Sequence, residues 1–254
     1  MTETTVKYAI IIPVLVLNLI VPASSIFASP VNDPALEWHL LFVKIRDRLI
    51  SKEEARSKLT ALEILLKESY LKNAHVQGED SLSFPLLGYD CHAIGGKGGS
   101  GYRAEGYDFF DGNDHRGHPA HDLFIRDRNQ DGIDDGTGKP VEVVSISSGL
   151  VVSINLNWES ASRIRGGNYI WIYEPIKSQY FYYAHLNEVL VRVGQTVSRW
   201  DRIGTVGRTG LNAYPKRSPT HLHLAVLQSA AGDPKPINPY LDLIKACQAG
   251  PPSR

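Results

Sequence analysis

The sequence lacks an excess of charge of either sign. Lysine and arginine together number 27 among the 254 residues, and aspartate and glutamate together also number 27. Nucleic-acid partners select for basic surfaces, so a formal net charge of zero argues against one. The hydrophobic content of 43% is too high for a disordered chain. We therefore expect one domain of catalytic size with an appendage, and no nucleic-acid partner.

Cysteine is scarce, since Cys91 and Cys247 are the only two. Their spacing has no metal-site signature, and a disulfide between them requires an oxidising compartment. The sequence alone leaves this pairing open. An H-E-x-x-H motif is also absent, which removes the glutamate base that helical zinc proteases use.

The N-terminal segment has the layout of a secretory signal. Lys7 precedes a charge-free apolar run that ends in small residues, with candidate cleavage points after Ser25 and Ala28. We expect residues 1–28 to be a signal peptide, and the alternative is an uncleaved membrane anchor. Both alternatives export the rest of the chain, to the periplasm, the cell envelope or the medium.

Residues 31–78 have the pattern of a small helical hairpin. Pro34 follows a candidate N-cap, Asp33, and the first helix carries apolar residues at helical spacing: Leu36, Leu40, Val43 and Ile45. The second helix begins with a capping box from Ser51 to Glu54 and keeps four leucines on one side: Leu59, Leu62, Leu65 and Leu66. Its position before the rest of the chain raises the hypothesis of intramolecular regulation, in which the hairpin covers a groove until it is displaced.

From about residue 82 the chain changes to short β-like runs separated by turns. Valine, isoleucine and aromatic residues alternate with polar ones, as in an antiparallel sheet with a buried face. No helix-sized amphipathic segment interrupts these runs, which excludes a doubly wound α/β fold. We predict a mainly β catalytic domain over residues 82–245 and a C-terminal tail over residues 246–254.

The stretch SPTHLHLAV, residues 218–226, places two histidines in an apolar strand. Successive strand side chains point to opposite faces, so His221 and His223 share one face while Leu222 and Leu224 share the other. One face is apolar, and the other can hold a metal ion. A lone histidine pair is more often structural or exposed, so the metal interpretation needs further ligands.

Further ligands occur upstream in DHRGHPAHDLFI. His118 and Asp122 lie four residues apart, where a loop enters a strand expected to begin near Leu123. Together with His223 they make three ligands, the number that catalytic zinc usually takes while it leaves one position for water. His121 would point away from such a site, to a place behind it or at the surface.

Two more histidines suit the chemistry of a metal-bound water. Zinc lowers the pKa of a bound water toward ~7 and polarises a scissile carbonyl, and a nearby histidine can accept the proton. His221 would lie close to that water and act as base or water-orienting group. His185, at the end of the strand-like run YFYYAHL, would stabilise the transition state or act as proton partner, and the two roles are interchangeable.

Taken together, these elements resemble the lysostaphin-type, LytM-like zinc metallopeptidases, which cut peptidoglycan cross-links. The family's H-x-x-x-D corresponds to His118 and Asp122, its H-x-H to residues 221–223, and its strand-end histidine to His185. The resemblance covers roughly residues 82–243 and implies a fold of the LytM-like duplicated-hybrid-motif type. It also implies one Zn²⁺ bound by His118, Asp122 and His223, with the other two histidines assisting catalysis.

The function that we expect is an exported zinc metalloendopeptidase that hydrolyses peptide bonds in peptidoglycan stem peptides or cross-bridges. One alternative is a non-catalytic LytM-like module that binds cell-wall material or activates a separate hydrolase. Such modules typically have eroded ligands, and the set here is complete. Another alternative is a zinc peptidase that acts on proteins. Tyr183 and Tyr214 are candidates for the groove lining, although core packing is the commoner role for a residue like Tyr183.

A second candidate metal site is the run DRNQDGIDDGTG. Asp127, Asn129, Asp131 and Asp135 stand at positions of an oxygen-ligand Ca²⁺ loop, but the twelfth position, where a bidentate glutamate is expected, is Gly138. A solvated acidic turn is the alternative. The glycine-rich residues 95–101 lack the order of a phosphate-binding loop, and we expect a flexible loop beside the groove.

Overall fold

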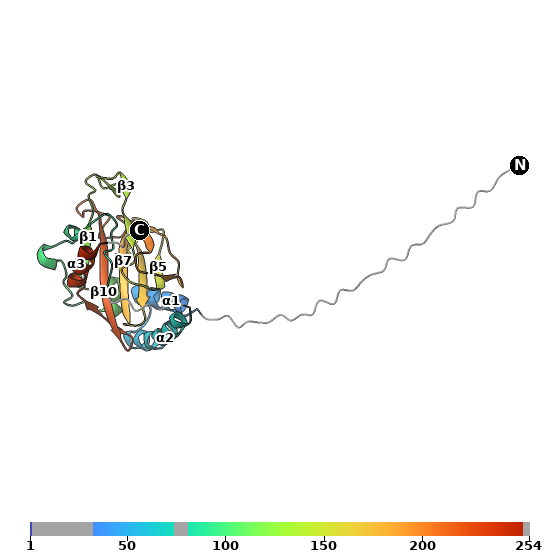
Figure 1. Cartoon of the computed structure of the whole chain (residues 1–254). Coiled ribbons are helices and arrows are strands. Elements are labelled where there is room, and N and C mark those ends of the chain that lie inside the picture. The colour runs from blue at the N-terminus through green and yellow to red at the C-terminus, as the bar shows by residue number, and fades with distance from the viewer. Residues whose placement is uncertain (2–32, 74–80, 251–254) are drawn as a thin grey trace. The chain divides into compact units, whose positions relative to one another are not determined.

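The computed structural model describes Met1 and residues 33–73 and 81–250 of the chain (Figure 1). The expected signal peptide or anchor, residues 1–28, lies outside the described residues apart from Met1. Within the described ranges, no helix is long and apolar enough to span a membrane. The helices and the sheet belong to one unit, residues 32–254.

Two helices begin the described chain, as the sequence predicts: α1 (Pro34–Arg46) and α2 (Lys52–Asn73). The Asp33 side chain caps α1 by accepting a hydrogen bond from the Ala35 amide at 2.9 Å. The Ser51 hydroxyl accepts one from the Glu54 amide at 3.2 Å at the start of α2. The helical hairpin is therefore confirmed, and so are both of its helix starts.

The buried face of α1 differs from the predicted one. Leu36 and Leu40 are 48% and 54% exposed, whereas α1 buries Ala35, Trp38, Leu41, Phe42 and Ile45. Aromatic packing sets this orientation, because Trp38 and Phe42 stack with ring centroids 5.4 Å apart and both rings contact Trp171 of the sheet. In α2 the prediction is wrong only for Leu65, which is 47% exposed.

A nine-stranded antiparallel sheet is the largest element in the rest of the unit, which confirms the mainly β prediction. Its main path runs β1-β10-β7-β6-β5-β8, with β11 paired to β10 and β9 joining β4 to β7. The strands are β1 (Ala120–Phe124), β4 (Glu142–Val144), β5 (Gly149–Asn155), β6 (Asn168–Glu174), β7 (Gln179–Val189), β8 (Thr196–Val197), β9 (Arg202–Val206), β10 (His221–Ala230) and β11 (Asp233–Ile237). A separate two-stranded sheet pairs β2 (Ile133–Asp134) with β3 (Lys139–Pro140).

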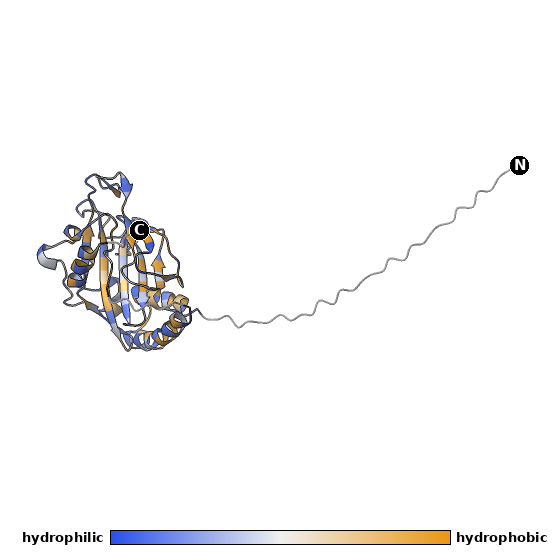
Figure 2. Ribbon diagram, viewed as in Figure 1, coloured by the Kyte–Doolittle hydropathy of each residue, from blue (hydrophilic) through white to orange (hydrophobic). Residues whose placement is uncertain are grey.

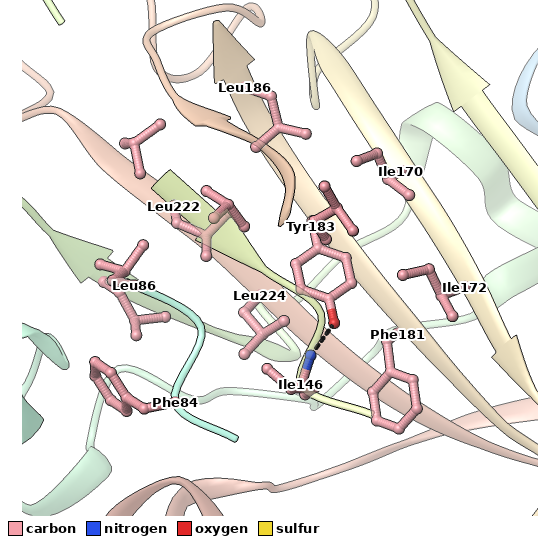
Figure 3. Close-up of a cluster of buried hydrophobic side chains, with 14 of the residues drawn as sticks. Phe84, Leu86, Ile146, Ile170, Ile172, Phe181, Tyr183, Leu186, Leu222 and Leu224 are labelled. Carbon is pink, nitrogen blue, oxygen red and sulfur yellow. Dashed lines mark hydrogen bonds between the residues drawn. The ribbon is translucent and has the colours of Figure 1, made fainter. Parts of the chain in front are cut away.

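One face of the sheet carries a mainly aliphatic core, called the aliphatic core below (Figure 3). Leu222 and Leu224 of β10 are fully buried there, as the alternation in the sequence predicts. Tyr183 is also fully buried, and its hydroxyl accepts a hydrogen bond from the Ile146 amide at 2.9 Å. Tyr183 is therefore a core residue and not part of a groove. In Figure 2, residues coloured orange for hydrophobicity recur along the strands of the sheet.

The opposite face carries an aromatic core to which the hairpin contributes. Trp38 and Phe42 of α1 pack there with Tyr169, Trp171 and Tyr180 of β6 and β7. By strand alternation, this is also the face on which His221 and His223 lie. The hairpin and the histidine pair therefore share one face of the sheet.

A third helix, α3 (Tyr240–Ala249), ends the described chain. Its Leu243 and Ala246 are buried in the aliphatic core, so the expected tail at residues 246–254 begins inside a packed helix. Cys247 of α3 forms a disulfide with Cys91 of η1 (Cys91–Ala93), with Cα atoms 5.7 Å apart. The structure thus settles the pairing that the sequence leaves open.

Candidate metal centre

Strand pairing brings the predicted ligands together. β1 and β10 are antiparallel neighbours, with Asp122 directly opposite His223. Directly opposed residues project to the same face, so their side chains meet. β1 begins at Ala120, earlier than the predicted start near Leu123, which places Asp122 inside the strand. His118 lies in the preceding loop and pairs through its backbone with Arg103.

The Asp122 carboxylate is at the centre of the cluster. Its Oδ1 atom lies 3.2 Å from His118 Nε2, 3.0 Å from His223 Nδ1 and 3.7 Å from His221 Nε2. Ligand atoms of His118, Asp122 and His223 all lie within 4.8 Å of one another. No other His, Cys, Asp or Glu group of this kind occurs in residues 33–73 and 81–250.

The donor set fits a divalent metal ion. The His118 Nδ1–H donates to the Gly101 carbonyl at 3.0 Å, so Nε2, which faces Asp122, is the ring nitrogen that can bind a metal ion once it gives up its proton. A backbone acceptor that fixes the ring in this way is typical of metal-binding histidines. Two imidazole nitrogens and one carboxylate oxygen suit zinc, with room for a fourth ligand.

Electrostatics in the cluster keeps the carboxylate ionised. Burial would raise the pKa of Asp122, but hydrogen bonds from His118 and His223 outweigh it and hold the pKa well below the usual range. The same hydrogen bond to Asp122 raises the pKa of His118, whereas burial lowers that of His223. Metal ligands must give up their protons, so an ionised Asp122 and a neutral His223 favour metal binding.

His221 and His185 are oriented as the proposed proton-transfer pair. The His221 Nδ1–H donates to the Pro219 carbonyl at 2.7 Å, and the His185 Nδ1–H donates to the Thr209 carbonyl at 2.8 Å. Their ring centroids are 4.9 Å apart. Each neutral ring therefore carries its lone pair on Nε2. Burial is the largest cause that lowers the pKa of His185 well below its usual value, and the charge of the neighbouring His221 is the second. The His185 ring is therefore neutral at neutral pH.

The backbone at His185 is in an unusual conformation, with a φ of 64°. Few residues other than glycine adopt this left-handed region, and residues that do so cluster at functional sites. The His185 amide donates a hydrogen bond to the Gly166 carbonyl at 2.8 Å, which holds the backbone in place. β7 thus turns the His185 ring toward the candidate ligand His223 while remaining paired in the sheet.

The cavity around the cluster includes residues that the sequence analysis missed. Arg165 and Tyr182 line it together with the five predicted site residues. Neither belongs to a recognisable motif, and alternation counted from His185 would select Tyr183. The left-handed backbone at His185 breaks that alternation, so Tyr182 faces the site. The carbonyl groups that orient the histidines also carry no sequence signal. Gly101 lies beside the site, as predicted for the glycine-rich segment.

The other histidines within residues 33–73 and 81–250 lie outside the cluster. His121 points away from it as predicted but is fully buried, with Nε2 2.9 Å from Asn238 Oδ1. His115 lines the metal cavity, and burial lowers its pKa to about 4. His39 of α1 hydrogen-bonds the Ser153 hydroxyl at 2.8 Å. Tyr214 is 56% exposed and packs against Trp158 with centroids 5.5 Å apart.

The acidic loop at residues 127–135 forms an internal hydrogen-bond network. Asp127 accepts from the Asp131 amide at 3.1 Å, from the Gly132 amide at 2.8 Å and from the Thr220 hydroxyl at 2.6 Å. Asn129 donates to Asp131 at 2.7 Å, and Asp135 accepts from the Arg128 amide at 3.1 Å. The described loop does not bring three carboxylates within 4.8 Å. A Ca²⁺ site here stays a prediction.

Comparison with known proteins identifies the domain. Residues 128–239 match the sequence model of peptidase family M23. The domain thus contains a segment of the M23 peptidase type. This match includes His185, His221 and His223 and begins after His118 and Asp122. The LytM-like resemblance of the sequence is thereby confirmed.

Individual relatives of the M23 domain are distant. An "uncharacterized metalloprotease" of Buchnera aphidicola subsp. Baizongia pistaciae is 32% identical over 115 residues, which are 45% of this chain and 27% of that protein. The chain thus matches about a quarter of the length of that relative. Lysostaphin from Staphylococcus simulans is 23% identical, with 61% of this chain and 54% of the other covered and a TM-score of 0.37. A zinc-containing peptidase from Vibrio cholerae is 23% identical, with 62% and 39% covered and a TM-score of 0.40.

Proposed function

We propose that the M23 domain is an exported zinc endopeptidase that hydrolyses peptide bonds in peptidoglycan stem peptides or cross-bridges. The observation that carries this proposal is the complete donor set of His118, Asp122 and His223 with two oriented histidines beside it. When bound, zinc supplies a water of lowered pKa and polarises the scissile carbonyl. The peptidoglycan substrate is proposed from the resemblance of the sequence to LytM-like enzymes.

In this proposal, different side chains bind the metal ion and transfer protons. His118, Asp122 and His223 would hold the ion, and the ionised Asp122 would offset part of its charge. His221, fixed by the Pro219 carbonyl, presents Nε2 near Asp122 and would accept the proton of the attacking water. His185, fixed by the Thr209 carbonyl, would present the Nε2 lone pair of its neutral ring toward the site and act as the proton partner.

Export is proposed on two grounds. The N-terminal residues have the pattern of a secretory signal or anchor. The disulfide between Cys91 and Cys247 suits an oxidising compartment, because cytoplasmic thiols are kept reduced. We therefore propose that the domain works in the periplasm, in the cell envelope or outside the cell.

The experiment that tests the proposal pairs zinc content with the release of soluble muropeptides from purified peptidoglycan. The mature protein should hold stoichiometric zinc and release muropeptides, and His223→Ala should lose both. Zinc without cleavage by either protein would favour a binding or hydrolase-activating module. Cleavage of casein without muropeptide release would favour a peptidase of proteins, and a protein without zinc would overturn the ligand assignment.

Regulation by the hairpin is a separate proposal. The hairpin lies on the face of the sheet that carries the metal centre, where Phe42 and Arg46 line a cavity that also contacts His223. Access to the site from this side therefore depends on α1. If displacement of the hairpin opens the site, a chain that begins at residue 80 should be more active than one that begins at residue 31. Equal activity of two folded chains would contradict the proposal.

A further inference from the structure

A small cavity adjoins the metal centre on the side of the hairpin. It has a volume of about 70 Å³, and it shares Arg165, Tyr182 and His223 with the cavity of the metal ligands. Phe42 of α1 and Phe109 of η3 (Phe109–Asp114) are among the residues that form its other walls. A group that occupies this cavity would therefore lie next to a bond held at the metal.

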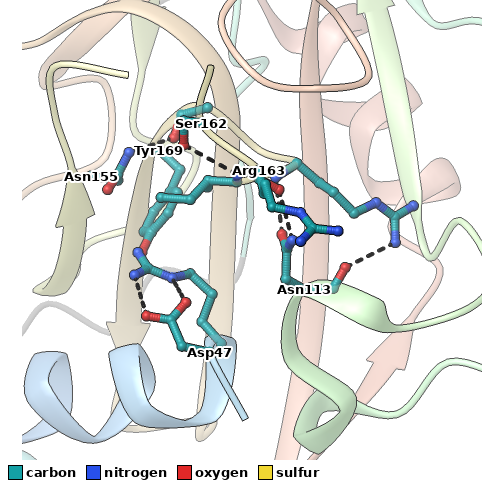
Figure 4. A network of polar contacts seen from close by, with 10 residues as sticks. Asp47, Asn113, Asn155, Ser162, Arg163 and Tyr169 are labelled. Atoms are coloured by element: carbon teal, nitrogen blue, oxygen red, sulfur yellow. Dashed lines mark hydrogen bonds and ion pairs between the residues drawn. The ribbon is translucent and has the colours of Figure 1, made fainter. Parts of the chain in front are cut away.

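The charge in this cavity is positive. Two arginines line it, and no aspartate or glutamate does so among the described residues. Arg46 is already neutralised, because its Nε and Nη2 atoms each lie 2.8 Å from a carboxylate oxygen of Asp47, and its Nη1 donates to the Tyr169 hydroxyl at 3.2 Å (Figure 4). Arg165 therefore supplies the net positive charge.

Hydrogen bonds hold Arg165 in place, and two nitrogens of its guanidinium group remain available as donors. Its Nη1 donates to the backbone carbonyl groups of Asn113 at 3.3 Å and His115 at 2.8 Å. Its amide donates to the Asn113 side chain at 3.0 Å, so both its backbone and its side chain are tied to η3 and the residue that follows (Figure 4). Nε and Nη2 have no partner within the described part of the chain. A fixed guanidinium with two free donors is the geometry that binds a carboxylate in a bidentate way.

The size of the cavity limits what can accompany that carboxylate. An apolar cavity of about 150 Å³ takes benzene, so a cavity of half that volume takes a carboxylate with a side chain no larger than a methyl group or so. Phe42 and Phe109 form apolar walls of this cavity. The occupant that fits is the C-terminal residue of a peptide, and the aromatic walls suit a small apolar side chain.

We propose that Arg165 binds the free C-terminal carboxylate of a peptide that ends in a small residue, so that the domain also acts as a carboxypeptidase. The reaction is hydrolysis of the last peptide bond. The C–N bond breaks, the hydroxyl of water joins the carbonyl carbon, and the proton joins the nitrogen of the released amino acid. This inference rests on the proposed hydrolytic function, and it adds the class of substrate that the site accepts.

Binding in the absence of metal tests the subsite apart from the chemistry. The full chain, treated with a chelator, is titrated calorimetrically with N-acetyl-alanyl-alanine and with its C-terminal amide, each in the L,L and D,D forms. We expect the acid of one stereochemical series to bind about tenfold more tightly than its amide, as for a charge-assisted hydrogen-bonded pair. Equal binding of acid and amide in both series would overturn the inference and needs no variant.

Variants then assign the preference to one side chain. Arg165→Gln should abolish the preference for the acid, and Arg165→Lys should keep part of it. Arg163→Gln makes the same charge change at an exposed position two residues away and should leave the preference intact. Retention of the full preference in folded Arg165→Gln would overturn the inference. If the wild-type chain prefers the acid but does not hydrolyse peptidoglycan, the result contradicts the proposed function and leaves the carboxylate subsite in place.

Product analysis with the zinc-loaded wild-type chain completes the test. Free alanine should be released from the acid, and the amide should be cleaved at least about tenfold more slowly. Endopeptidase products from peptidoglycan without any release of alanine would support the proposed function and contradict the carboxypeptidase inference.

Discussion

Trp38 of α1 donates its indole N–H to the hydroxyl of Tyr180 on β7 at 3.0 Å. The Tyr180 hydroxyl in turn donates to Glu63 of α2 at 3.0 Å. Trp38 and Tyr180 are both fully buried, so this chain of hydrogen bonds lies inside the aromatic core. Both helices are thereby fastened to the face of the sheet that carries the candidate metal centre. The hairpin is thus part of the domain's core, whereas its pattern in the sequence suggests an appendage.

The first prediction concerns Glu63. Its carboxylate also accepts hydrogen bonds from the Ser229 hydroxyl at 2.5 Å and from the Gly232 amide at 3.2 Å. Glu63→Ala should lower the free energy of unfolding by roughly 2–4 kcal/mol, because several partly buried donors lose their acceptor. Urea unfolding measures the change. The exposed Glu53→Ala on the same helix should stay within about 0.5 kcal/mol of the wild type. A similar small effect at Glu63 would mean that the hairpin is held by apolar packing alone.

The second prediction concerns the metal ligands. Asp122→Ala should weaken zinc binding by more than about 100-fold, because it removes the atom around which the three histidines gather. Zinc content after dialysis against a competing chelator measures the effect. His39→Ala removes a histidine that is bonded to Ser153 and should retain zinc. Retention of zinc by Asp122→Ala would show that the ion is held by other groups.

How far the sequence predicts the site depends on the kind of information involved. Strand alternation is a local rule, so the shared face of His221 and His223 follows from the sequence alone and is confirmed by the fold. The approach of Asp122 to His223 requires the pairing of β1 with β10, which no local pattern specifies. The need of zinc for three protein ligands suggested that step, and the family resemblance supported it.

Other features escaped prediction because they depend on tertiary packing. The exposed Leu36 and the buried Trp38 of α1 are both apolar, and hydrophobic periodicity alone did not show which one would face the aromatic strands. The disulfide between Cys91 and Cys247 joins residues 156 positions apart in the sequence, and only the docking of α3 brings them together. The position of Arg165 similarly depends on the long-range contact of its loop with η3.

The third prediction separates metal binding from proton transfer. His221→Ala and His185→Ala should each lower peptidoglycan hydrolysis by roughly 100- to 10,000-fold, the usual contribution of a positioned acid or base. Both variants should keep zinc, since neither histidine belongs to the ligand set of His118, Asp122 and His223. Zinc content and hydrolysis are measured on the same preparations. Loss of zinc from either variant would reassign that histidine as a ligand.

The fourth prediction concerns the disulfide. The bond closes a loop of 156 residues, for which the chain-entropy model gives a stabilisation of roughly 5 kcal/mol. The double variant Cys91→Ser, Cys247→Ser should lose up to that amount in chemical unfolding. A reducing agent should destabilise the wild type to a similar degree and leave the double variant unchanged. Equal stability of reduced and oxidised wild type would show that packing of α3 alone holds this end of the domain.

The fifth prediction concerns acid stability and Asp134. Burial would raise the pKa of this carboxyl, but hydrogen bonds from Tyr89, Arg126 and Thr137 outweigh it and hold the pKa well below the usual range. The Arg126 guanidinium donates to both carboxylate oxygens, at 3.0 and 3.2 Å. A depressed pKa stabilises the fold at pH values above the ordinary carboxyl pKa of about 4, and this stabilisation is lost as the pH falls through the lower, folded-state value.

Asp134→Asn should therefore be less stable than the wild type at neutral pH, and the difference should shrink between about pH 5 and pH 2. Urea unfolding at a series of pH values in a calcium-free buffer measures this convergence. Asp135→Asn, which changes the neighbouring carboxylate with its single backbone hydrogen bond, should follow the wild-type profile more closely. If the wild type and Asp134→Asn differ by the same amount at every pH, the ionised carboxylate does not stabilise the loop, and the cost of the substitution comes from altered hydrogen bonding alone.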